Sequence, residues 1–214
     1  MKFIRASGLV ALSLMLMACP LARSRPLAEP ELITVEGPYT HAGSELTFPA
    51  SVGEFRRTSV HSYDSKALDV SAGYDLVAAS RAIAATVYVY PATRIISILS
   101  PADVVALTRA LAANQEFETR KQEILRSHPG ARLIAERNVP PPLDSIPLLG
   151  RMATFEFEDV FAGQRQDLHS DLYLFSYVGE KWMVKYRFTY PSSADASREI
   201  DDFIRAVPWN VVAS

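Results

Sequence analysis

Hydrophobic and polar residues alternate over residues 172–190, near the C-terminal end of the chain. A period of two with aromatic and β-branched side chains is the strongest signal for a β-strand that a sequence offers. Residues 178–181, between the two halves of this stretch, have the composition of a tight turn. We therefore predict a β-hairpin whose second strand turns an aromatic face toward the core, since aromatic side chains bury large apolar areas. That face consists of Trp182, Val184, Tyr186, Phe188 and Tyr190.

Seven earlier segments also have the pattern of strands, and the last of them leads into the hairpin. They are residues 45–48, 54–63, 68–74, 84–90, 132–138, 152–161 and 165–177. The fourth segment is apolar almost throughout, which indicates a central strand that is covered on both faces.

A long helix is predicted between the two groups of strands. Ser100, Pro101 and Asp103 supply an N-cap serine, a proline at the first helical position and an acid in the first turn. A Pro-Gly pair at 129–130 ends the helix. Its apolar sector contains Val104, Leu107, Leu111 and Leu125, interrupted by Asn114 and Glu118. The sequence leaves open whether the helix bends at this interruption or is partly solvated there.

A second helix is predicted at the C-terminal end, with Ser192 or Ser193 as its cap. Its apolar residues recur at i, i+3, i+4 and i+7, which is typical of a helix with one buried face. They are Ile200, Phe203, Ile204 and Val207.

The order of these elements predicts one α+β domain over residues 44–214. We expect a mainly antiparallel sheet of about seven or eight strands, packed with one long helix and a C-terminal helix. The element order resembles that of PsbP-type proteins over most of residues 45–207. This resemblance implies an assembly or accessory subunit and assigns no site residues.

The first 18 residues are typical of a secretory signal peptide. Lys2 and Arg5 precede an apolar run that is too short to span a bilayer comfortably. The run ends in Leu16-Met17-Ala18-Cys19, which resembles the lipobox of bacterial lipoproteins. The resemblance implies that Cys19 becomes the lipidated N-terminus, facing the periplasm, and leaves inner and outer membrane open. The alternative is an ordinary secretory signal with an accidental cysteine.

Residues 19–43 contain several prolines and no sustained periodicity. This composition predicts a lipidated N-terminus followed by a flexible tether, which would let the domain reach a partner near the membrane.

Composition excludes several classes of function. Removing residues 1–18 takes away two basic and no acidic residues, which leaves 20 basic against 24 acidic and a net charge of −4. Nucleic-acid binding normally requires a concentrated positive footprint, so we expect none. A single cysteine excludes a disulfide framework and a cysteine-rich zinc site.

No catalytic or cofactor motif is present, and we expect no metal and no cofactor. The four histidines, His41, His61, His128 and His169, are far apart in the sequence. A carboxylate pair at Glu156 and Glu158 is the other candidate, and its alternative is a solvated strand face.

Lys185 and Arg187 are the candidate partner-binding residues, because they lie on one face of the last strand. Arg56 or Arg57 could join them across the sheet, and such a positive row would hold a carboxylate, a phosphate or an acidic partner. The alternative is that a flanking helix partly covers them and supplies acids to pair with them. Those acids would be Glu199, Asp201 or Asp202.

Together these patterns predict a lipid-anchored envelope protein that acts as a non-catalytic binding or assembly module. A hydrolase with a triad assembled from distant residues, such as a serine with His61 or His169, is one alternative. A carrier of an apolar ligand is another, and it would need an open cavity between the sheet and the long helix.

Overall fold

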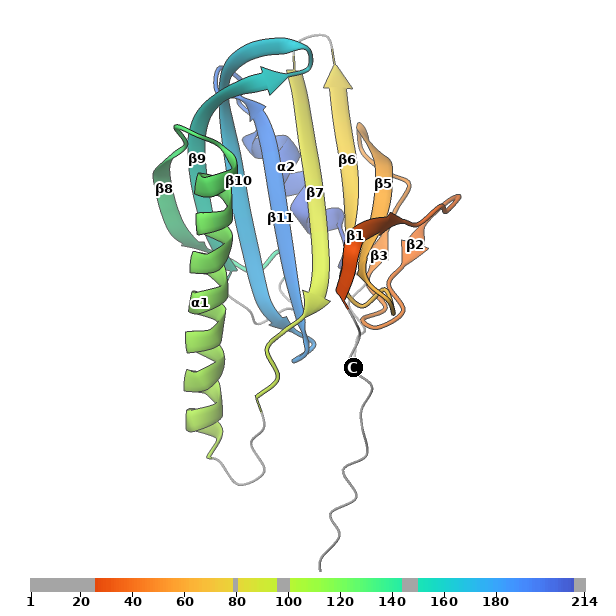
Figure 1. Cartoon of the computed structure of the whole chain (residues 1–214), viewed down its shortest axis with the longest axis vertical. Coiled ribbons are helices and arrows are strands. Elements are labelled where there is room, and N and C mark those ends of the chain that lie inside the picture. The colour runs from red at the N-terminus through yellow and green to blue at the C-terminus, as the bar shows by residue number, and fades with distance from the viewer. Residues whose placement is uncertain (1–25, 79–80, 96–100, 144–149, 210–214) are drawn as a thin grey trace, which may run out of the picture.

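The predicted antiparallel sheet forms the centre of the molecule (Figure 1). A computed structural model describes residues 26–78, 81–95, 101–143 and 150–209. Its nine-stranded sheet has the order β1-β5-β6-β7-β11-β10-β9-β8, with β4 also paired to β5, and β2 and β3 form a separate pair. The strands are β1 (Pro26–Leu32), β2 (Tyr39–Thr40), β3 (Thr47–Phe48), β4 (Ser51–Val52), β5 (Phe55–Asp64), β6 (Val70–Ala78), β7 (Arg81–Pro91), β8 (Arg132–Val139), β9 (Gly150–Phe161), β10 (Gln164–Val178) and β11 (Trp182–Pro191).

The predicted fold class is confirmed, and so is the hairpin. β10 and β11 pair antiparallel and are joined by a turn in which Gly179 and Glu180 both have positive φ. β11 lies between β10 and β7 in the middle of the sheet. The predicted aromatic face is correct, because Val184, Tyr186 and Phe188 are fully buried in one cluster.

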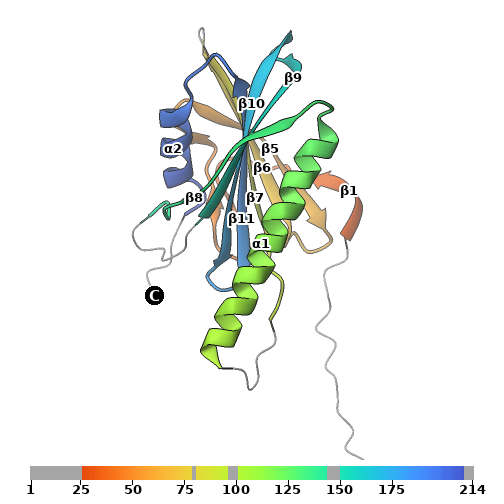
Figure 2. The ribbon, with the colours of Figure 1, turned by 90° about the vertical axis from the view of Figure 1, so that its left-hand side faces the viewer.

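The two helices lie on opposite faces of the sheet, as the view along its edge shows (Figure 2). α2 (Ser197–Ala206) buries Ile200, Phe203 and Ile204. The ring of Phe203 lies 5.1 Å from that of Tyr74 and 5.6 Å from that of Phe188, between ring centroids. This face holds the larger apolar core.

The predicted start of α2 is wrong. The helix begins at Ser197, after the N-cap residue Ala196, and the Ser197 amide donates to the Asp195 carboxylate at 3.1 Å. Its predicted cap residues instead lie in the turn after β11, where the Ser192 amide donates to Asp167 and the Ala194 amide donates to Pro191. A serine before an apolar run therefore marked the turn rather than the helix start.

α1 (Ala102–Ser127) crosses the other face of the sheet and buries Phe117, Lys121 and Ile124. It begins one residue later than predicted, because Pro101 is its N-cap residue, and Ser100 lies outside the described residues. Of the predicted apolar sector, only Leu125 packs on the core beneath α1. Leu107 is 62% exposed and Leu111 is 60% exposed, although both belong to that sector.

The predicted tether is too long. Residues 26–43 belong to the folded domain, because β1 pairs with β5 and His41 is completely buried. Gly43 is so close to Trp182 that a Cβ there would lie 2.6 Å from the indole ring. The prolines Pro26 and Pro30 made this segment resemble a tether, but it forms an edge strand, where a missing amide donor is tolerated. Residues 19–25 lie outside the described residues.

Candidate functional site

Lys185 and Arg187 lie in the central strand β11, on the face that α1 crosses. Their direction follows from strand geometry, since the alternate residues Val184, Tyr186 and Phe188 fill the opposite core. They line a cavity of about 260 Å³ between α1 and the sheet, which we call the cationic pocket. The pocket is lined by Tyr88, Arg120, Glu123, Ile124, Ser127, Leu172, Lys185 and Arg187.

Lys185 lies against an aromatic ring rather than an acid. Its Nζ is 3.8 Å from the ring centroid of Tyr88, the residue opposite it on β7. Within the described part of the chain, Lys185 forms no ion pair. Burial, together with the positive charge of Arg120, lowers the pKa of Lys185 to about 8. The ammonium group is therefore held in a place that disfavours its charge.

Arg187 is held by two uncharged partners. Its Nε donates to Ser170 Oγ at 3.1 Å, and its NH2 group lies 2.7 Å from Nε2 of His128, the residue that ends α1. Because a guanidinium can only donate, Nε2 of His128 must accept, which leaves the ring proton on Nδ1. That nitrogen lies 3.4 Å from Asp159. Burial and then the charge of Arg187 lower the pKa of His128, so the ring is neutral near pH 7.

Arg120 contributes a third cation from α1, and it differs from the other two because it is paired. Its guanidinium lies 2.7 Å from Glu116 and 2.5 Å from Glu123. Neither acid forms an ion pair with Lys185 or Arg187 among the described residues. Asp69, just before β6, feels the charge of Lys185, but burial dominates and raises the pKa of this carboxyl. The pocket therefore presents one ammonium and one guanidinium that lack a contacting carboxylate.

This arrangement suits an anion. A lysine supplies a compact positive charge, and an arginine supplies a planar set of donors that matches carboxylate and phosphate oxygens. The cavity is also too polar for an apolar ligand, since three of its lining residues are cationic. The carrier hypothesis needs an open apolar cavity at this place, and the residues described there do not form one.

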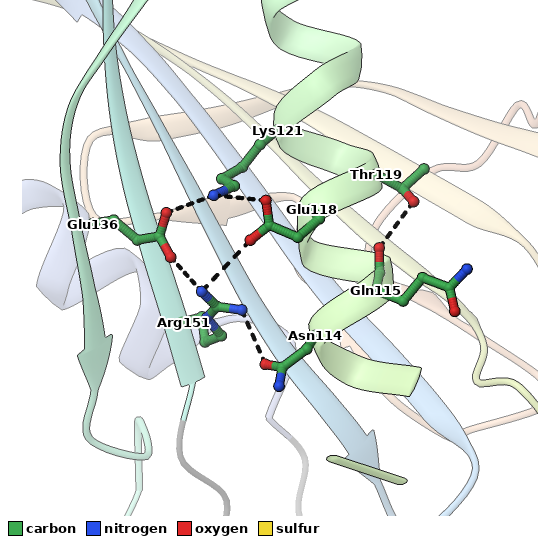
Figure 3. Close-up of polar contacts among 7 residues, drawn as sticks. All are labelled: Asn114, Gln115, Glu118, Thr119, Lys121, Glu136 and Arg151. Carbon is green, nitrogen blue, oxygen red and sulfur yellow. Dashed lines mark hydrogen bonds and ion pairs between the residues drawn. The ribbon is translucent and has the colours of Figure 1, made fainter. Parts of the chain in front are cut away.

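A second polar cluster lies nearer the N-terminal end of α1 than the cationic pocket, and its charges are paired with one another (Figure 3). Lys121 lies 2.6 Å from Glu136 on β8 and 2.9 Å from Glu118. Arg151 on β9 contacts both of those acids and also donates to Asn114 at 3.0 Å. Two cations face two acids, and the hydrogen bond from Lys121 holds the pKa of Glu136 below its usual range. Each charge of this cluster therefore has an opposite charge beside it, and the contacts link α1 to β8 and β9.

Binding of a partner by Lys185 and Arg187 stays a prediction, whereas the alternative of a covering helix is correct in one respect and wrong in another. A helix does cover the two residues in part, but it is α1. The acids Asp201 and Asp202 lie on α2, on the opposite face of the sheet. Arg57 donates instead to the carbonyl oxygens of Phe48 and Gly37, and β6 and β7 separate its strand from β11.

The histidines do not form the predicted triad in the described part of the structure. The side chain of His61 forms no hydrogen bond with the other described residues, and that of His169 lies 4.0 Å from Glu156 and forms no hydrogen bond with a described serine. His41 does lie 2.6 Å from the hydroxyl of Ser44, three residues away, but both belong to one local turn. Its other ring nitrogen is buried without a partner, so no acid orients the ring.

The two candidate glutamates are also separated by their partners. Glu156 lies 2.7 Å from Arg132, and Glu158 lies 2.6 Å from Arg165. Each carboxylate is thus occupied by a neighbouring cation on the sheet surface, which favours the solvated strand face over an acid-base pair.

Tyr88 and Arg120 were not recognised from the sequence as pocket residues, and His128 was not recognised as a partner of Arg187. Arg120 lies on α1, His128 is the C-cap residue of that helix, and only the crossing of α1 over β7 and β11 brings them to Tyr88, Lys185 and Arg187. The spacing of Arg120 four residues after Glu116 was a visible signal, but such pairs are common on solvated helices.

No protein-family model, curated protein or solved structure matches this chain. Within the described ranges, no three histidine, cysteine or acidic side chains are placed to hold a metal ion. No helix among the described residues has the length and apolarity needed to cross a bilayer.

Proposed function

We propose that this protein is a lipid-anchored binding module of the cell envelope that holds an anionic group of its ligand or partner in the cationic pocket. The observation that carries the proposal is that Lys185 and Arg187 lie together beneath α1 without a contacting carboxylate. A buried charge is costly unless it is paired, so this site gains most from a ligand that supplies the missing negative charge.

The lipid anchor in this proposal rests on the leader. The sequence Leu16-Met17-Ala18-Cys19 supports lipidation of Cys19 and release of residues 1–18. Two or three acyl chains make membrane attachment stable, and the protein would then work at the periplasmic surface of one of the two membranes. A binding or assembly role, as the resemblance to PsbP-type proteins also implies, needs no catalytic residue.

Thermal unfolding of the full-length lipoprotein in detergent tests the pocket. The probe is inorganic phosphate, added in place of chloride at constant ionic strength. A ligand that binds only the folded state at ten times its dissociation constant stabilises that state by about 1.4 kcal/mol, so the melting temperature should rise by several degrees. Citrate, added in the same way, tests a carboxylate ligand.

Matched variants locate the effect. Lys185→Met keeps the length of the side chain against Tyr88 and removes its charge, so phosphate should no longer raise the melting temperature. Arg165→Met removes an exposed cation from the sheet surface and should respond as the wild type does. An equal response of the wild type and Lys185→Met would contradict the proposed site. The anchor is tested separately, because Cys19→Ala should abolish labelling by a fatty-acid analogue.

A further inference from the structure

An apolar stripe on the N-terminal half of α1 faces away from the sheet. Val104, Leu107 and Leu111 are 47%, 62% and 60% exposed, respectively. At 3.6 residues per turn, the centre of this stripe lies roughly 120° around the helix from Phe117, the residue that packs on the sheet. From Asn114 onward this side of the helix carries Glu118 and Gln122, and its last apolar residue, Leu125, is half-buried against the core beneath α1. The stripe is therefore confined to the first three turns and is not used by the fold.

The stripe lies at the end of the molecule where the described chain begins. Pro26 pairs with Asp64 at the end of β5, and Trp182 at the start of β11 pairs with Pro91 at the end of β7. Both views show α1 extending beyond the sheet at this lower end (Figures 1 and 2). Near this end, the guanidinium of Arg109 on α1 lies 5.4 Å from the ring centroid of Tyr177, next to the β10–β11 turn.

The chain between the anchor and the fold is short. Only six residues lie between Cys19 and Pro26, because β1 begins much earlier than the composition indicates. The seven Cα-to-Cα steps from Cys19 to Pro26 span at most about 25 Å when fully extended. A lipid on Cys19 would thus hold the lower end of the domain close to the bilayer surface.

We propose that the N-terminal half of α1 rests on the bilayer, with Val104, Leu107 and Leu111 in the boundary between headgroups and acyl chains. The lipid on Cys19 would attach the protein to the membrane, and the stripe would orient the domain on it. This inference therefore rests on the proposed lipidation of Cys19. A stripe of three side chains is weak by itself, but the anchor keeps it at a high local concentration near the lipid. The domain would then stand with its β6–β7 end away from the membrane.

Lipid fits this surface better than a protein partner does. The stripe is convex and lies on a single helix, and none of the cavities described includes it. The neighbouring charges are of both signs, as Arg109 lies 3.9 Å from Glu180. The contact is therefore apolar, and phosphatidylcholine vesicles should suffice without anionic lipid.

A single fluorescent probe tests this orientation. Cys19 is the only cysteine of the chain, and lipidation blocks its thiol, so Leu107→Cys introduces a unique labelling site. The labelled lipoprotein is reconstituted into phosphatidylcholine vesicles that carry a nitroxide on the acyl chains. Val77→Cys is the matched control, because Val77 is 82% exposed and pairs with Ala82 at the opposite end of the sheet.

Vesicle flotation and quenching of the probe separate the anchor from the stripe. We expect the protein to float with the vesicles and the probe at 107 to be quenched severalfold more than the probe at 77. Flotation with equal quenching at both positions would overturn the contact of α1 with lipid and leave the anchor intact. A probe at 107 that is shielded from water but not quenched would show that a second copy or another protein covers the stripe, which also overturns the proposal. A protein that does not float would refute the anchor and the orientation together.

Discussion

The two faces of the sheet are covered by helices of different character. α2 meets the sheet through Ile200, Phe203 and Ile204, in a core that contains few polar groups. α1 is more than twice as long but buries only Phe117, Lys121 and Ile124 among its residues. Much of what holds α1 to the sheet is charge, as in the contacts of Lys121 with Glu136.

Because of this difference, one face of the sheet contributes mainly to stability and the other can bind a ligand. Burial of apolar side chains stabilises an interface and leaves no polar group without a hydrogen-bond partner. A polar interface leaves room for ligands, because its charges need solvent or counter-charges and its packing is looser. The α2 face therefore fixes the fold, whereas the α1 face holds the cationic pocket.

The largest effect is expected in the α2 core. Val184→Asp places an unpaired carboxylate among Tyr186, Phe188 and their neighbours and should cost more than about 4 kcal/mol of unfolding free energy. The same change at Val77, which is 82% exposed, should alter the unfolding free energy by less than about 0.5 kcal/mol. Urea denaturation of both variants measures the contrast. Similar midpoints would mean that the α2 face is not the dry core.

The two helices can be compared directly by truncation to alanine. Phe203→Ala removes a fully buried ring and should destabilise the protein by about 3 to 5 kcal/mol. Leu107→Ala removes an exposed side chain from α1 and should change the unfolding free energy by less than about 0.5 kcal/mol. Calorimetric melting of both variants measures this, and a large loss for Leu107→Ala would show that the stripe packs within the domain.

The charged cluster beneath α1 should have an intermediate effect. Arg151→Ala removes a cation that contacts Glu118 and Glu136 and that lies 4.2 Å from the ring centroid of Phe117, so we expect a loss of about 1 to 3 kcal/mol. Arg165→Ala breaks a well-exposed pair and should leave the unfolding free energy almost unchanged. Equal losses in urea denaturation would argue against a structural role for the cluster.

The smallest effect concerns the pH dependence that Lys185 adds to stability. Its pKa of about 8 in the folded state lies below its ordinary value of 10.5. Between these values the unfolded chain binds a proton that the folded protein has released, so stability should rise with pH in this range. The rise is expected in the wild type and should be smaller in Lys185→Met.

An anion in the cationic pocket should make this rise smaller, because it binds the charged form of the lysine. The stabilisation by phosphate is therefore expected to fall as the pH rises through about 8. Measurement of the melting temperature from pH 6.5 to 10 with and without phosphate checks both trends. A phosphate effect that is independent of pH would place the anion away from Lys185.

The sequence by itself determined the elements whose periodicity reflects one buried face. Alternation from Trp182 to Tyr190 predicted β11 and its buried face, and the i, i+3, i+4 spacing of Ile200, Phe203 and Ile204 predicted the packing face of α2. These patterns are reliable because hydrophobic burial repeats with the geometry of the element itself.

Tertiary structure alone decided which face of α1 is buried and that residues 26–43 belong to the folded domain. Phe117 and Ile124 pack on the sheet because Arg151 and Glu136 come from distant strands to pair with polar residues of the helix, and no local pattern encodes those partners. The pairing of β1 with β5 likewise turned a proline-containing segment into an edge strand. The cationic pocket has the same origin, since Lys185 meets Tyr88 only through the pairing of β11 with β7 and the crossing of α1 above them.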